Sequence, residues 1–181
     1  MTERATKQQR MDLAFAALLN DDDAAALTAL TRIEQQGDAR AIPHLLRAQI
    51  ANASPAVQSR ISALLNQVKA PDAMSTLMTA IADPALRPAR RTAIAAIWNA
   101  GLDAREHLEP IIALAIEGDD QECFECLTVI ENQEIWPEKA ARLGLARARK
   151  AMETEKDDYK GTMLKDIVQS LESRLGLADI N

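Results

Sequence analysis

Apolar and polar positions alternate along the chain with the period of an α-helix, in blocks that are separated by short polar turns. Between Ala24 and Gln36, for example, Leu27, Leu30 and Ile33 fall on one helical face. Prolines and glycines stand near the ends of such blocks, where helices begin or stop. The pattern predicts ten helices. The first three cover about residues 3–19, 24–36 and 39–51, the next six begin near residues 55, 72, 88, 104, 120 and 136, and the last covers about 159–175.

Four single residues carry specific expectations. Gly37 is expected in the left-handed conformation after the second helix, and Pro88 is expected to begin the sixth. Ile50 is expected on the apolar face of the third helix. The indole of Trp136 is expected to cover the end of the core.

The polar turns recur about every 32 residues. One series lies at 34–38, 67–72 and 99–103, with an altered fourth copy at 132–137. A second series alternates with it, at 20–22, 52–55, 83–84 and 118–120. Two alternating series of turns predict stacked helix pairs, because a single pair cannot bury its own apolar face. We therefore expect an all-α fold.

Residues 36–46 carry the clearest resemblance to a known family. They read Gln-Gly-Asp-Ala-Arg-Ala-Ile-Pro-His-Leu-Leu, which resembles the inner turn and second helix of short bacterial HEAT repeats. Residues 101–105 partly repeat this segment, and the resemblance extends over about residues 11–152. Two copies depart from it, since Ala70-Pro71 replaces the glycine of the turn and residues 134–136 replace the whole turn.

The resemblance implies a right-handed α-α superhelix, a HEAT-like solenoid of the armadillo type whose inner helices line a concave face. We expect about four helix pairs with N- and C-terminal capping helices. The expected organisation is one HEAT-like repeat domain over residues 1–181, with a capping helix at 1–20, repeats at 21–153 and a second capping helix at 157–181.

Composition and charge narrow the classes of partner. The net charge of −6 argues against broad nucleic-acid binding, which needs a dominant basic surface. The longest apolar stretches, such as residues 111–116, are too short to span a bilayer. Residues 1–10 are charged and lack the apolar run of an export signal. We therefore expect a cytoplasmic protein that does not bind membranes.

Cys123 and Cys126 form a CxxC motif, which invites a zinc or redox interpretation. A structural zinc site needs four ligands, and His107 is the only nearby candidate for a third. A reactive thiolate needs an electropositive setting, whereas the surrounding residues are mostly acidic. We therefore interpret both cysteines as packing residues and expect no metal and no cofactor.

Proteins that resemble HEAT repeats mostly bind other proteins, so the leading hypothesis is a noncatalytic protein-binding module, a scaffold or adaptor. Its partner would contact polar positions on the inner helices, namely Arg40, His44, Arg47, Asp72, Thr76, Thr79, Glu106, Glu109 and Arg142. One alternative is a HEAT-like enzyme or chaperone of the bilin lyase or DNA glycosylase type, although no catalytic motif points to it. A purely structural scaffold is another. Self-association through the apolar stripe Leu164 to Leu175 of the C-terminal helix also stays open.

Overall fold

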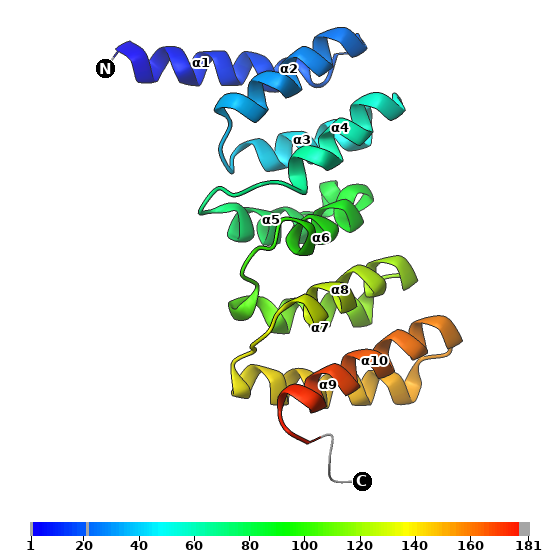
Figure 1. The fold of residues 1–181 in the computed structure, drawn as a ribbon. Helices are drawn as coiled ribbons and strands as arrows, with labels where there is room; N and C mark the ends of the chain where they lie inside the picture. The colour runs from blue at the N-terminus through cyan, green and yellow to red at the C-terminus, as the bar shows by residue number, and fades with distance from the viewer. Residues whose placement is uncertain (1, 21, 178–181) are drawn as a thin grey trace. The chain divides into compact units, whose positions relative to one another are not determined.

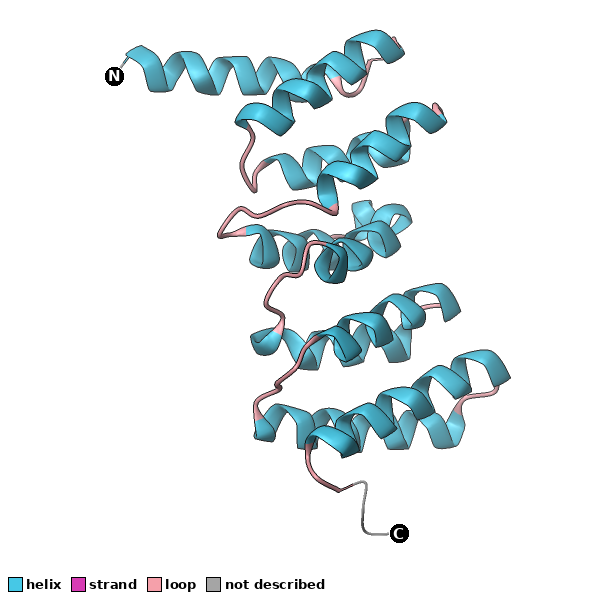
Figure 2. Ribbon diagram, viewed as in Figure 1, coloured by secondary structure: helices cyan, strands magenta, loops and turns pink. Residues whose placement is uncertain are grey.

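The computed structural model describes residues 2–20 and 22–177. Within these residues the chain forms helices joined by turns and loops, and it contains no strand, which confirms the expected all-α class (Figure 2). The outermost positions of the two expected capping helices, residues 1 and 178–181, lie outside the described residues. The chain divides into two compact units, Met1–Leu102 (unit 1) and Asp103–Asn181 (unit 2). Each unit is described by itself.

Unit 1 is a stack of helical hairpins (Figure 1). Neighbouring helices pair as α1 with α2, α3 with α4 and α5 with α6. Between the pairs, α3 contacts both α1 and α5, and α4 contacts both α2 and α6, so the helices form two layers. The elements are α1 (Thr2–Ala17), α2 (Asp23–Gln36), α3 (Ala41–Ala51), α4 (Pro55–Leu65), α5 (Ala73–Ala82), the 3-10 helix η1 (Pro84–Ala89) and α6 (Arg90–Asn99).

Small apolar side chains let these helices approach closely. Ala26, Ala48 and Ala96 are fully buried among larger residues such as Leu30 and Ile61. In the structure, the helices of each hairpin are joined by a short turn of the 20–22 series. The sequence repeat instead grouped the helices on either side of turns such as 34–38. The two groupings divide the same two-layered stack at different turns.

Several local expectations for unit 1 were wrong. Pro88 was expected to begin the sixth helix, but the Asp83 side chain accepts a hydrogen bond from the Ala85 N–H and starts the 3-10 helix four residues earlier. Gly37 does not adopt the left-handed conformation expected of it, since its φ is −70°, whereas Gly101 does, with φ 62°. Ile50 was expected in the core but is 40% exposed near the end of α3.

Unit 2 contains two long hairpins. α7 pairs with α8 and α9 with α10, while α7 also packs on α9 and α8 on α10. Gly144 marks the close approach of α9 to α7, because a Cβ atom there would lie 3.3 Å from the Ile112 Cγ1 atom. The elements are the 3-10 helix η2 (Arg105–His107), α7 (Leu108–Glu117), α8 (Asp120–Asn132), α9 (Glu138–Thr154) and α10 (Asp158–Arg174).

The ends of the helices in unit 2 are fixed by specific polar contacts. Asp119 and Glu122 form a reciprocal capping box at the start of α8. The Trp136 indole is buried after α8, and its Nε1–H donates to the Ile130 carbonyl at 3.3 Å, so this ring covers the end of the core as the sequence predicts.

Two further predictions concern burial. Cys123 and Cys126 are both buried and neither forms a disulfide, as expected for packing residues. The apolar stripe of α10 also packs inside unit 2, where Leu164, Ile167, Val168 and Leu171 are buried, so these side chains are not a free surface for self-association. No described helix combines the length and the apolar character needed to cross a bilayer.

Candidate binding site

Arg40 stands at the N-terminal end of α3 and is held by its own chain. Its guanidinium forms a fork with Asp38, with Nε–Oδ1 at 2.9 Å and Nη2–Oδ2 at 2.7 Å, and the Arg40 backbone N–H also donates to Oδ1 at 3.0 Å. The side-chain hydrogen bond to Asp38 raises the pKa of Arg40. Nη1 donates to Gln8 Oε1 of α1 at 3.3 Å. Arg40 therefore links the start of α3 to the turn before it and to α1.

His44, one turn further along α3, stacks on an aromatic ring of α1. The His44 and Phe15 ring centroids are 4.2 Å apart and the rings are nearly parallel, at 5°. Burial lowers the pKa of His44, and the positive charge of Arg47 lowers it further. Of the three predicted positions on α3, Arg40 and His44 both contact α1, whereas Arg47 lies exposed on the surface of its helix.

The remaining predicted positions of unit 1 lie on α5, which packs beside α3, or directly before it in the case of Asp72. Asp72 and Thr79 are exposed and Thr76 is half-buried. The Thr79 hydroxyl donates to the Ser75 carbonyl at 2.9 Å, within its own helix. These side chains therefore offer a polar helix surface rather than a convergent set of reactive groups.

The predicted positions of unit 2 are exposed and two of them form ion pairs. Glu109 of α7 pairs with Arg147 of α9 at 3.4 Å, and Arg142 pairs with Glu138 one turn away at 2.8 Å. Glu106 is exposed in η2. Exposed pairs of this kind stabilise a fold by about 0–1 kcal/mol each, so they leave the surface free to exchange partners.

The Asp38–Arg40 fork has a counterpart in unit 2. Asp103 Oδ1 accepts the Arg105 backbone N–H at 3.1 Å, and Asp103 Oδ2 accepts from Arg105 Nη2 at 2.5 Å. These hydrogen bonds lower the pKa of Asp103 to about 2. The repeated tripeptide Asp-Ala-Arg in the two turns was the signal from which the fork could have been inferred.

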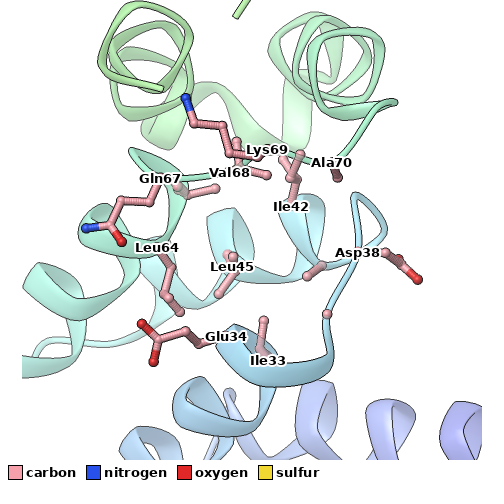
Figure 3. Close-up of a pocket in the computed structure, with 13 residues that line it drawn as sticks. Ile33, Glu34, Asp38, Ile42, Leu45, Leu64, Gln67, Val68, Lys69 and Ala70 are labelled. Carbon is pink, nitrogen blue, oxygen red and sulfur yellow. The ribbon is translucent and has the colours of Figure 1, made fainter. Parts of the chain in front are cut away.

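A surface cavity of about 320 Å³ opens beside α3 in unit 1 (Figure 3). Its walls come from the end of α2, the start of α3, the end of α4 and the loop before α5. Apolar side chains form the floor, among them Ile33, Ile42 and Leu45. The full lining is Ile33, Glu34, Gly37, Asp38, Ala41, Ile42, Leu45, Leu64, Leu65, Gln67, Val68, Lys69 and Ala70.

The charged residues at the rim of the cavity already have partners within unit 1. Glu34 binds Arg60 at 2.5 Å, Asp38 binds Arg40, and Lys69 Nζ donates to the Ala100 carbonyl. The side chains of Asp38 and Lys69 point away from the cavity (Figure 3). The cavity thus combines an apolar interior with a rim whose charged side chains each have a partner in unit 1. Sequence periodicity did not reveal the cavity, because two turns that are far apart in the sequence form it. The one sequence signal of the cavity is Ala70, which stands where the HEAT-like turn has a glycine.

The thiol of Cys123 is not a reactive thiolate. Burial raises the pKa of Cys123 to about 11, so this thiol is protonated at neutral pH. Over residues 2–20 and 22–177, no three His, Cys, Asp or Glu side chains lie close enough together to hold a metal ion.

Two cations of α10 were missed by the sequence analysis. Lys160 Nζ, which is buried, donates to the carbonyls of Ile116 and Gly118 at 2.7 Å each and lies 3.5 Å from Glu155 Oε2. At the other end of α10, Arg174 Nη2 donates to the carbonyls of Glu131 and Gln133 at 2.9 Å. The two side chains satisfy carbonyls at the C-terminal ends of α7 and α8, where positive charge is favoured. Their role is structural.

Comparisons with protein-family models, with curated proteins and with solved structures return no match. The resemblance to HEAT repeats therefore stays a prediction from the sequence. The structure itself defines the class as all-α, with helical hairpins stacked in two layers within each unit.

Proposed function

We propose that the chain is a noncatalytic protein-binding module of the HEAT-like type, a right-handed superhelix that binds its partner on the layer of α3 and α5 in unit 1. The observation that supports this function is the cavity beside α3. Its volume of about 320 Å³ lies at the lower end of the range of about 300–1,000 Å³ that ligand pockets occupy. A space of this size accepts an apolar side chain of a partner.

The surroundings of the cavity favour a partner protein over a reacting substrate. Acyl transfer, glycosyl transfer and proton abstraction need a nucleophile or base beside a second polar group, all facing one space. Here the rim carboxylates of Glu34 and Asp38 are bound to arginines, and the floor is apolar. In the proposed complex, an apolar anchor of the partner enters the cavity, and acidic residues elsewhere on the partner contact Arg47 on the exposed face of α3.

Selection of binding peptides tests this function directly. A displayed random peptide library is selected on the intact protein and counter-selected on Ala70→Trp, in which the indole fills the cavity mouth. The matched control is Ala56→Trp, because Ala56 is exposed and does not line the cavity. We expect peptides with an apolar anchor to bind the wild type and the control at least about tenfold more tightly than Ala70→Trp. Equal binding to all three, or no enriched peptide, contradicts the proposal.

Charge reversal on α3 tests the polar half of the contact. Arg47→Glu is the cleaner variant, because reversing Arg40 would also place a glutamate beside Asp38. We expect Arg47→Glu to weaken the selected acidic peptides while it changes the free energy of unfolding by no more than about 0.5 kcal/mol. Unchanged peptide affinity would show that the acidic residues of the peptide do not contact Arg47.

A further inference from the structure

A second surface groove of unit 1 lies between α1 and α2 and has no part in the proposed peptide site. Its volume is about 390 Å³, and every residue that lines it belongs to α1, α2 or the turn between them. Most of the lining is alanine, and the largest apolar side chain is Leu13, which is 68% exposed. The lining residues are Leu13, Ala14, Ala17, Asp22, Ala24, Ala25, Thr28, Ala29 and Arg32.

The groove is asymmetric along its length. Because α1 and α2 form a hairpin, Ala17, Asp22 and Ala25 lie near the connecting turn, whereas Leu13, Ala29 and Arg32 lie further from it. Asp22 and Arg32 are separated by ten residues of sequence on or beside α2, which is about 15 Å along a helix. One end of the groove is therefore acidic and the other end is basic, and Leu13 projects between them from a surface lined mostly by alanine.

We propose that this groove is a self-association surface, and that its occupant is a second copy of the same chain in an antiparallel, two-fold arrangement. A two-fold axis through the middle of the groove places each acidic end against the partner's basic end. Asp22 of each copy then faces Arg32 of the other, twice by symmetry. Each Leu13 enters the alanine-lined half of the opposite groove, near Ala17 and Ala25.

The same two-fold axis produces both the charge contacts and the leucine contacts. For this reason a second copy fits the groove better than an unrelated apolar segment does. The parallel arrangement would place Asp22 near Asp22 and Leu13 near Leu13 of the second copy. It would lose the contacts between opposite charges and leave the alanine-lined part of each groove unfilled. Arg32 is exposed and has no ion pair among the described residues, so it is available to the second copy.

The size of the surface predicts a weak and reversible dimer. With 14 residues, α2 is about 21 Å long, and two helices of about 10 Å diameter lie side by side, which gives a face of roughly 400 Å² in projection. Standard interfaces bury about 800 Å² per partner, so this contact belongs with the small, transient ones.

Sedimentation equilibrium of the full chain tests the dimer directly. We expect the average mass of the wild type to rise reversibly towards two chains as its concentration increases from about 10 μM to about 1 mM. Leu13→Asp should raise the dimer dissociation constant about 100-fold or more, since each dimer loses two buried leucines. The matched control is Leu143→Asp on α9, which changes an equally apolar, 54% exposed residue outside the groove and should leave dimerisation unchanged. A wild type that stays monomeric, or a Leu13→Asp variant that dimerises like the wild type, overturns the proposal.

Charge swapping tests the antiparallel register. Arg32→Glu and Asp22→Lys should each raise the dissociation constant about tenfold, because each homodimer then opposes like charges twice. An equimolar mixture of the two variants should regain wild-type association, because the two introduced charges then attract each other and the native Asp22 faces the native Arg32. Failure of the mixture to associate overturns the register. Asp22 also caps α2, so circular dichroism is recorded for each variant; the Leu13→Asp and Arg32→Glu arms leave that cap intact.

Discussion

Units 1 and 2 are built from the same kind of helical hairpin but are stabilised differently. In unit 1, packing of small apolar side chains holds the pairs together, and the cavity beside α3 and the groove between α1 and α2 both lie in this unit. In unit 2, buried or half-buried cations of α10 bind the C-terminal ends of α7 and α8. The comparison shows two ways to build stacked hairpins. Side chains of a neighbouring hairpin can bind the carbonyls at the helix ends, or the hairpins can leave an exposed surface to which a partner can bind.

Truncation of a buried leucine should give the largest difference in stability loss between the two units. Leu164→Ala in unit 2 should lower the free energy of unfolding by about 4 kcal/mol, because Leu164 is fully enclosed and the void cannot collapse easily. Leu45→Ala in unit 1 should cost only about 2–3 kcal/mol, because Leu45 borders the surface cavity and the void opens to water. Urea unfolding followed by circular dichroism measures both. Equal losses would contradict the difference in packing.

Removal of a capping lysine gives the next largest contrast. Lys160→Met keeps the apolar stem but leaves the Ile116 and Gly118 carbonyls without their donor, which should cost about 2–3 kcal/mol. Lys69→Met is the matched control in unit 1, since exposed Lys69 donates to the Ala100 carbonyl alone; it should cost about 0.5–1 kcal/mol. The same urea titrations measure both losses.

The buried thiols supply an independent readout of the same contrast. Cys123 and Cys126 both lie in unit 2, so their reaction with a thiol reagent reports the opening of that unit. Lys160→Met should accelerate the reaction and Lys69→Met should not. A similar acceleration by both variants would mean that Lys69 also stabilises the folded state of unit 2.

The smallest expected effect is a pH dependence at the contact between α1 and α3. The pKa of His44 is below its unfolded value of about 6.5, so the unfolded chain binds more protons as the pH falls. The contribution of His44 is therefore complete above about pH 6.5 and is lost as the pH falls towards the folded-state pKa. His44→Phe keeps a ring on Phe15 but cannot titrate, so its melting temperature should fall less than that of the wild type between about pH 7 and pH 5. Parallel pH profiles would exclude this role of His44.

Local patterns predicted the helices well because each helical segment by itself shows apolar residues at helical spacing. The same patterns predicted the all-α class and the burial of Cys123, Cys126 and Trp136. They were wrong where competing local contacts decide, as at Pro88, where Asp83 begins a 3-10 helix first. Exposed Ile50 shows a second limit, because an apolar residue near a helix end can fall outside the packed face.

The candidate site was harder to predict because its parts are brought together by tertiary structure. The cavity joins two turns, and the Phe15–His44 stack joins two helices that are not neighbours in the sequence. Lys160 reaches carbonyls 42 and 44 residues away, a distance over which helical periodicity gives no information. Arg47 was placed on an exposed face correctly, whereas the contacts of Arg40 and His44 with α1 needed the structure.

The positions of Lys160 and Arg174 at opposite ends of α10 have a consequence for hydrogen exchange. Departure of this one helix would release the terminal carbonyls of both α7 and α8 in a single event. Amide protons of α10 and of the last turns of α7 and α8 should then exchange together, as one cooperative opening rather than as independently fraying ends. The lifetime of native unit 2 is thereby coupled to the residence time of its final helix.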